Sequence, residues 1–123
     1  MDGERLAVEL ASRMHEAVPV GLSVGADADM LWFLIEGKRC GGSYACRWPK
    51  NGQDSVEDLT IRACELALND LQDVVTEKTA EPWPATEGRP PRPVVCLVGR
   101  AIEMWFGSRD HPVARLRPLA LDG

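Results

Sequence analysis

The residues with the clearest chemical potential are one cysteine and a distant acid–histidine pair. Cys40 lies in the stretch KRCGG, where two neighbouring cations favour the thiolate, the nucleophilic form of cysteine. A cysteine nucleophile also needs a base, and Asp110 and His111 place a carboxylate next to an imidazole. These three residues are the candidates for a cysteine-dependent enzyme. The alternative is a solvated cysteine in a glycine turn, because nothing in the sequence shows that the two loops meet.

The cysteines, histidines and acids do not have the spacing of a metal site. Structural zinc sites bring ligands in close pairs about two to four residues apart, whereas the nearest cysteines here are Cys40 and Cys46. Asp27 and Asp29 are able to ligate a cation, but aspartates in a turn between two strands usually cap backbone groups. The sequence also has no glycine-rich phosphate loop and no nucleophile elbow. We therefore expect neither a metal ion nor a cofactor.

Large apolar side chains form a second set of candidates, for binding rather than for catalysis. Trp32, Phe33 and Trp105 fall in strand-like apolar segments. Trp105 alternates out of phase with its apolar neighbours, which predicts that it shares the other sheet face with Trp32 or Phe33. Leu59 and Leu66 widen the apolar arc of a helical pattern beyond what one buried face requires. We predict that these five residues form a binding surface.

Composition and charge limit the possible classes of protein. The chain has 123 residues, of which 45% are hydrophobic and 27% charged, as expected for a single globular domain over residues 1–123. Its net charge is −5 and its basic residues are scattered, which argues against nucleic acid and anionic membranes as partners. The longest apolar run, residues 30–35, is too short to cross a bilayer. With no secretory signal recognised, we expect a cytoplasmic protein with reduced thiols.

Periodicity indicates the elements that must position these residues. The expected order is α-β-β-β-α-β-β-β, an α+β fold in which an antiparallel sheet is packed against two helices. Asp2 and Pro19 mark the ends of the first helix, and Asp54 or Ser55 caps the second. The helices are expected at 2–18 and 54–78, and the strands at 20–24, 30–35, 43–48, 94–98, 101–106 and 113–119.

A proline-rich stretch over residues 79–93 follows the second helix. The RPPRP motif within it matches a polyproline ligand, but the valines that follow begin a strand. Residues 94–123 are too few for a separate domain, which argues against a linker. We predict a stiff crossover within one domain, which carries the chain back to the first sheet and holds Trp83 against the body of the protein.

The order of elements, the acidic composition and the two-sided second helix together resemble the type III secretion chaperones. The resemblance implies a dimeric module that holds unfolded segments of effector proteins against its surface. Those chaperones usually end with another helix, where this chain has a strand and a tail. The arginine-rich, lysine-poor composition is typical of a high-GC bacterium or its phage.

The resulting hypothesis is a non-catalytic protein-binding module, chaperone-like or an adaptor, that forms a homodimer. Its partner is expected to be another protein or a second copy of itself. One alternative is a small-molecule-binding protein or a cysteine-dependent enzyme that uses Cys40 with Asp110 and His111. A further alternative is a structural or adaptor protein of a phage particle.

Overall fold

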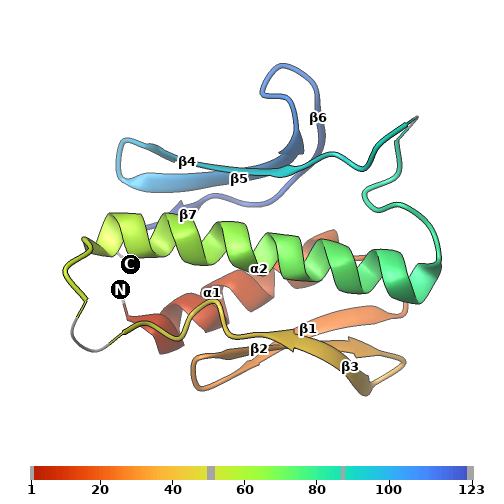
Figure 1. The fold of residues 1–123 in the computed structure, drawn as a ribbon, viewed down its shortest axis with the longest axis horizontal. Coiled ribbons are helices and arrows are strands. Elements are labelled where there is room, and N and C mark those ends of the chain that lie inside the picture. Colours follow the sequence, from red (N-terminus) through yellow and green to blue (C-terminus); the bar gives the residue numbers. More distant parts are fainter. Residues whose placement is uncertain (1, 50–51, 87, 122–123) are drawn as a thin grey trace.

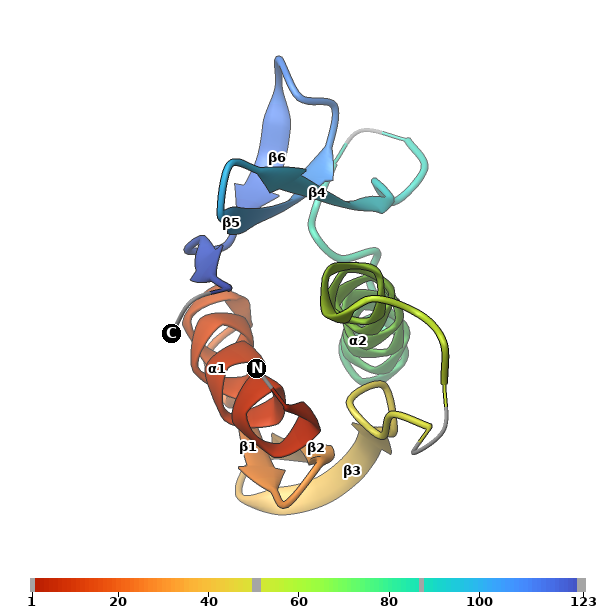
Figure 2. The same ribbon diagram turned by 90° about the vertical axis from the view of Figure 1, so that its left-hand side faces the viewer.

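The computed structural model describes residues 2–49, 52–86 and 88–121, and in these residues two helices lie between two antiparallel sheets. Viewed end-on, the helices form a middle layer with one sheet on each side (Figure 2). The elements are α1 (Gly3–Ala17), β1 (Leu22–Asp27), β2 (Met30–Ile35), β3 (Lys38–Ser43), α2 (Val56–Thr79), β4 (Pro93–Val98), β5 (Ala101–Gly107), β6 (Pro112–Arg115) and β7 (Leu119–Ala120) (Figure 1). The α+β class and the predicted order of elements are confirmed, with the short β7 added at the end.

The strands after the proline-rich stretch form a sheet of their own. The first sheet has the order β1-β2-β3, and the second has the order β4-β5-β6 with β7 also paired to β5. The prediction that the crossover returns the chain to the first sheet is therefore wrong. Gly99 and Arg100 form a tight turn that pairs β4 with β5, and β6 and β7 then pair with the other edge of β5. Such local pairings close shorter loops than a return to the distant first sheet would.

Both helices begin where side-chain caps were expected. The Asp2 carboxylate accepts from the Arg5 amide at 2.8 Å, and the Ser55 hydroxyl accepts from the Asp58 amide at 3.2 Å. These oxygens satisfy amides that have no partner within the first helical turn. The first helix ends at Ala17, before Pro19, as predicted.

The wide apolar face of α2 is covered by other elements of the same chain. α2 contacts β2 and β3 of the first sheet and β4 of the second, so it has a sheet on each side. This arrangement accounts for the arc that motivated the homodimer prediction. None of the helices in the described ranges is long and apolar enough to span a bilayer.

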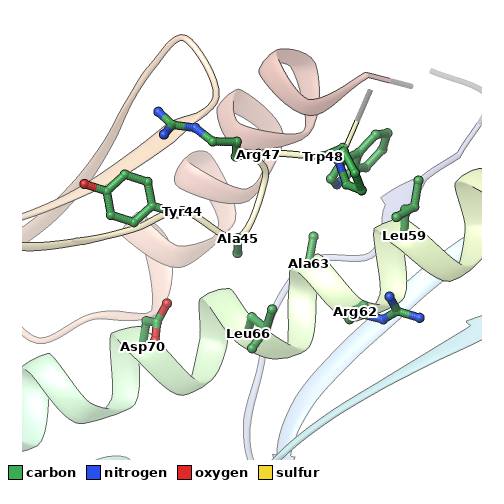
Figure 3. A pocket seen from close by; sticks show the side chains of 10 residues that line it. Tyr44, Ala45, Arg47, Trp48, Leu59, Arg62, Ala63, Leu66 and Asp70 are labelled. Atoms are coloured by element: carbon green, nitrogen blue, oxygen red, sulfur yellow. The ribbon is translucent and has the colours of Figure 1, made fainter. Parts of the chain in front are cut away.

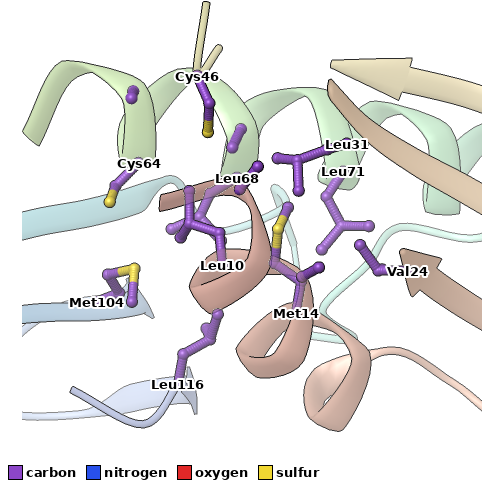
Figure 4. Close-up of a cluster of buried hydrophobic side chains, with 14 of the residues drawn as sticks. Leu10, Met14, Val24, Leu31, Cys46, Cys64, Leu68, Leu71, Met104 and Leu116 are labelled. Carbon is purple, nitrogen blue, oxygen red and sulfur yellow. The ribbon is translucent and has the colours of Figure 1, made fainter. Parts of the chain in front are cut away.

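The buried side chains form a cluster that draws on both helices and both sheets (Figure 4). Leu10 and Met14 of α1 lie in the middle of this cluster and have no exposed area. Leu31 of the first sheet and Met104 of the second belong to it as well, and neither is exposed. The two sheets are thus joined by a shared core rather than by strand pairing.

The third strand lies five residues earlier than the predicted 43–48. Glu36 and Gly37, with φ values of 48° and 78°, suffice to turn β2 into β3, so the glycines that follow belong to the strand. A Cβ on Gly41 would meet Cγ2 of Val74 on α2 at 2.9 Å, which is too close for any real side chain. Gly41 therefore serves close packing of β3 against α2, and residues 44–49 become a separate connecting segment.

The Arg13 side chain links α1 by hydrogen bonds to the connection between β6 and β7. It is 7% exposed, and its Nε donates to the carbonyls of Arg117 and Pro118, both at 3.1 Å. Its Nη1 pairs with the Glu9 carboxylate at 2.7 Å, and its Nη2 donates to the Pro118 carbonyl at 2.9 Å. The forked guanidinium is suited to this role because it presents several donors in fixed directions.

The crossover is packed against the body of the protein at two points. The ring of Trp83 meets the ring of Phe106 edge-on, with centroids 5.2 Å apart. The Gln72 side-chain amide on α2 donates to the carbonyls of Trp83 at 3.2 Å and Pro91 at 2.6 Å. The predicted packing of Trp83 against the body of the protein is confirmed.

Candidate functional site

The three residues proposed for cysteine chemistry lie in different parts of the fold. Cys40 is in β3 rather than in a glycine turn, and its Sγ donates to the Phe33 carbonyl at 3.5 Å. Asp110 and His111 lie between β5 and β6 in the second sheet, across the helix layer from β3 (Figure 1). The structure therefore does not bring the proposed nucleophile and base together.

The two most buried thiols are unsuited to chemistry as well. Burial raises the pKa of Cys46 to about 12, with the nearby Asp29 carboxylate adding to the effect. Burial raises the pKa of Cys64 to about 12, with Cys46 adding to the effect. A thiol that stays protonated is a poor nucleophile and a poor metal ligand. Within residues 2–49, 52–86 and 88–121, no group of three or more His, Cys, Asp or Glu side chains is able to hold a metal ion.

The aromatic residues predicted for a binding surface do not share a face. Phe33 is 1% exposed and belongs to the core. Trp105 is 3% exposed in the second sheet, with the Arg115 guanidinium 5.7 Å from its ring centroid. Trp32 is half-buried in the first sheet, with the Arg39 guanidinium at 4.1 Å. The predicted common face is therefore wrong, because Trp105 and the other two belong to different sheets and Phe33 points into the core.

The two predicted leucines do lie together, in a groove between α2 and residues 44–49 (Figure 3). We call this the α2 groove. Its volume is about 330 Å³, near the lower end of the range for ligand-binding pockets in proteins. Its apolar lining includes Tyr44, Ala45, Trp48, Leu59, Ala63 and Leu66.

Residues 44–49 are fixed opposite α2 by contacts of Ser43, Cys46 and Gly3. The Ser43 hydroxyl donates to the Asp70 carboxylate at 2.6 Å and accepts from the Ala45 amide at 3.2 Å. Cys46 points into the core and has no exposed area. Gly3 at the start of α1 lies so close to the Cys46 carbonyl that a Cβ would not fit. The groove is therefore held open by the fold rather than formed by a loose loop.

Two large side chains leave much of their surface uncovered at the groove. Tyr44 is 64% exposed and Leu66 is 50% exposed. Single exposed apolar residues are ordinary, but a concave apolar patch with such side chains on both walls is typical of a binding site. Leu59 and Leu66, two of the residues predicted for a binding surface, both line this groove beside the first half of α2.

Two arginines flank this apolar lining. The Arg47 guanidinium lies 5.0 Å from the centroid of the Tyr44 ring and 3.6 Å from the Asp29 carboxylate. The Arg62 guanidinium lies 3.3 Å from the Asp54 carboxylate. Both arginine side chains are more than half exposed. Ion pairs of exposed side chains contribute only about 0–1 kcal/mol to the stability of a protein. Their guanidinium groups are thus free to exchange these partners for a carboxylate of a ligand.

The sequence did not single out Tyr44, Trp48 and the two arginines. Tyr44 and Trp48 were assigned to a strand because residues 43–48 alternate in hydropathy, and the displaced third strand hid their position beside α2. The two glycines before Ser43 were the available signal, since a strand that contacts a helix closely needs small residues.

Comparisons with models of protein families, with curated proteins and with solved structures found no match to this chain.

Proposed function

We propose that the chain is a non-catalytic protein-binding module whose α2 groove binds an extended segment of a partner protein. The segment carries a large apolar side chain flanked by acidic residues. The observation that carries this proposal is the groove itself, with Leu66 and Tyr44 exposed on its two walls and Arg47 and Arg62 beside them.

The dimensions of the groove suit a short extended segment. From Leu59 to Asp70 the groove follows α2 over about 16 Å of helix axis. That length corresponds to about five residues of extended chain. Burial of one large apolar side chain contributes about 1.5–3 kcal/mol, and a hydrogen bond to a charged group about 1.5–3 kcal/mol. These amounts suit a reversible interaction with an unfolded or flexible segment.

A chaperone-like or adaptor role follows from this kind of ligand, since an exposed segment of an unfolded partner is extended. We place the chain in the cytoplasm, where its free cysteines stay reduced. The homodimer stays a prediction, to be tested by sedimentation at micromolar concentration. Within one chain, α2 already has a sheet on each side, so binding at the groove does not depend on a second copy.

The proposal is tested with fluorescent peptides of stated chemistry. One capped peptide carries a central phenylalanine flanked by aspartates, a second replaces the aspartates with lysines, and a third replaces the phenylalanine with serine. Fluorescence anisotropy is expected to show at least tenfold tighter binding of the first peptide, because only it matches both the apolar lining and the arginines.

A pair of matched variants locates the binding site. Leu66→Glu places a carboxylate in the groove and should remove binding of the aspartate-flanked peptide. Val8→Glu makes a similar change on an exposed position of α1, where Val8 is 61% exposed, and should leave binding unchanged. Equal binding of all three peptides, or equal loss in both variants, would contradict the proposal. Tight binding of free phenylacetate, with no gain from a peptide, would instead indicate a small-molecule site.

A further inference from the structure

The α2 groove is closed at one end by a hydrogen bond between its two walls. The Ser43 hydroxyl, just before residues 44–49, donates to the Asp70 carboxylate of α2 at 2.6 Å. Asp70 is the last residue of α2 that lines the groove, and Ser43 is itself buried. A chain bound along the groove therefore has to end at this hydrogen bond or leave the groove there.

This closed end carries a carboxylate without a cationic partner. Asp70 is half-buried, and among the residues that the structure describes no cation forms an ion pair with it. Arg47, on the opposite wall, pairs with Asp29 instead, at 3.6 Å. Ser43 occupies Oδ2 of Asp70, whereas Oδ1 has no partner in the described residues and is not sealed from solvent. Figure 3 shows this carboxylate pointing from α2 toward the wall that holds Tyr44. Oδ1 is thus available to a donor of a ligand.

The other end of the α2 wall has the opposite charge. Arg62 precedes Asp70 by about 12 Å along the helix axis. Its side chain is 60% exposed and pairs with the exposed Asp54 at 3.3 Å. Leu66 lies halfway between Arg62 and Asp70 and is 50% exposed. Along α2 the groove therefore offers a carboxylate, an apolar side chain and a guanidinium group, in that order (Figure 3).

We infer that the α2 groove binds the free amino terminus of a partner protein, an inference that rests on the proposed function. The terminal ammonium group donates to Oδ1 of Asp70 at the closed end, where no further residue has to precede it. The side chain of the second residue packs beside Leu66. An acidic side chain at the fourth residue reaches Arg62 at the other end.

The spacing of an extended chain fits these three positions. Leu66 and Arg62 lie about 6 Å and about 12 Å from Asp70 along the helix axis. In an extended chain, the Cα atoms of the second and fourth residues lie about 5 Å and about 11 Å from the terminal nitrogen. These two residues also direct their side chains to the same face of the chain. Both side chains therefore point into the groove while the first and third point away.

Other parts of a protein chain match the closed end less well. An internal segment presents a neutral amide to the Asp70 carboxylate, and its preceding residues have to leave the groove at the Ser43 hydrogen bond. A carboxyl terminus would place a second negative charge against Asp70. An ammonium group provides both the charge and the chain end that this position requires.

The inference is tested with peptides that carry a fluorophore at the carboxyl end and begin with serine, phenylalanine, serine and aspartate. Fluorescence anisotropy is expected to show at least tenfold tighter binding of the peptide with a free amino terminus than of its acetylated form. A free peptide with two serines added at its start should bind no better than the acetylated form, because its ammonium group lies too far from the phenylalanine. 2-Phenylethylamine, which has the amine and the ring without a backbone, should compete only weakly.

Asp70→Asn removes the charge at the closed end and keeps an acceptor for the Ser43 hydroxyl. This variant should lose the tenfold advantage of the free amino terminus. Its unchanged binding of the acetylated peptide would show that the groove is still folded. Asp110→Asn makes the same chemical change at an exposed position between β5 and β6, and should alter the binding of neither peptide.

The inference is overturned if the free and acetylated peptides bind equally, if 2-phenylethylamine binds as tightly as the free peptide, or if Asp70→Asn and Asp110→Asn act alike. The proposed function is judged separately, by replacing phenylalanine with serine in the acetylated peptide. A preference for phenylalanine without any gain from the free amine would leave the groove as a site for internal segments. Loss of that preference would contradict the proposed function itself.

Discussion

At the scale of single residues, the chemistry of the cysteines depends on where the fold places them. Cys46 and Cys64 are fully buried, and burial holds the pKa of each near 12. Cys40 and Cys96 are only partly buried. The residue that looked most reactive in the sequence, Cys40, lies in a strand far from the histidine proposed to activate it. Position rather than neighbouring sequence decides the role of each thiol.

The raised pKa of Cys64 predicts a loss of stability at alkaline pH. In the unfolded chain a thiol ionises near pH 8.5, whereas in the folded protein the pKa of Cys64 is about 12. The contribution of this thiol to stability is complete below about pH 8.5. It falls as the pH rises toward 12, by at most about 1.4 kcal/mol for each pH unit, because only the unfolded chain releases the proton.

Urea denaturation between about pH 8 and pH 11 measures this effect. The stability difference between wild type and Cys64→Ala should shrink steadily as the pH rises. Val75→Ala truncates another fully buried side chain of α2 without removing a titratable group. Its difference from wild type should stay constant with pH. Parallel curves for all three proteins would contradict the assignment of a high pKa to Cys64.

At the scale of elements, α2 makes contact with both sheets, with the groove segment and with the crossover. It contacts both sheets, forms one wall of the groove, and holds the crossover through Gln72. The Gln72 side chain connects the middle of the helix to both ends of the crossover, through the carbonyls of Trp83 and Pro91. The crossover is thereby part of the folded structure rather than a free linker.

Gln72→Ala is expected to lower the unfolding free energy by about 1–3 kcal/mol, because two partly buried carbonyls lose their donor. Asn69→Ala, almost one turn earlier, is the matched control. The Asn69 side chain is exposed and, among the residues that the structure describes, donates only to the Glu65 carbonyl of the same helix, so its removal should cost less than about 0.5 kcal/mol. Chemical denaturation distinguishes the two variants, and equal losses would show that the Gln72 hydrogen bonds to the crossover add nothing to stability.

The sequence predicted those elements whose signals are local. The helix caps depend on neighbouring residues: Asp2 caps the first helix as predicted, and of the two candidates Asp54 and Ser55 it is Ser55 that caps the second. The turn at Gly99 likewise depends on adjacent residues. The position of the third strand depends on Gly41 meeting Val74, which are far apart in the sequence. The division into two sheets likewise depends on which distant strands pair. Of the residues that line the groove, helical periodicity points to Leu59 and Leu66, whereas their counterparts in residues 44–49 become visible only in the tertiary fold.

At the scale of the whole molecule, two sheets and two helices share one core, and the outer flank of α2 is left exposed between them (Figures 1 and 2). The α2 groove lies on the side of that flank toward the first sheet. We propose that this groove holds a flexible part of another protein.

The central claim, that the α2 groove is the binding site, is tested most directly by photo-crosslinking. The aspartate-flanked peptide carries benzoylphenylalanine in place of its central phenylalanine, and mass spectrometry identifies the crosslinked residues. We predict crosslinks to residues 44–49 and to the part of α2 around Ala63 and Leu66, and their loss in Leu66→Glu. Crosslinks on the outer faces of the sheets, or an unchanged pattern in the variant, would contradict the account.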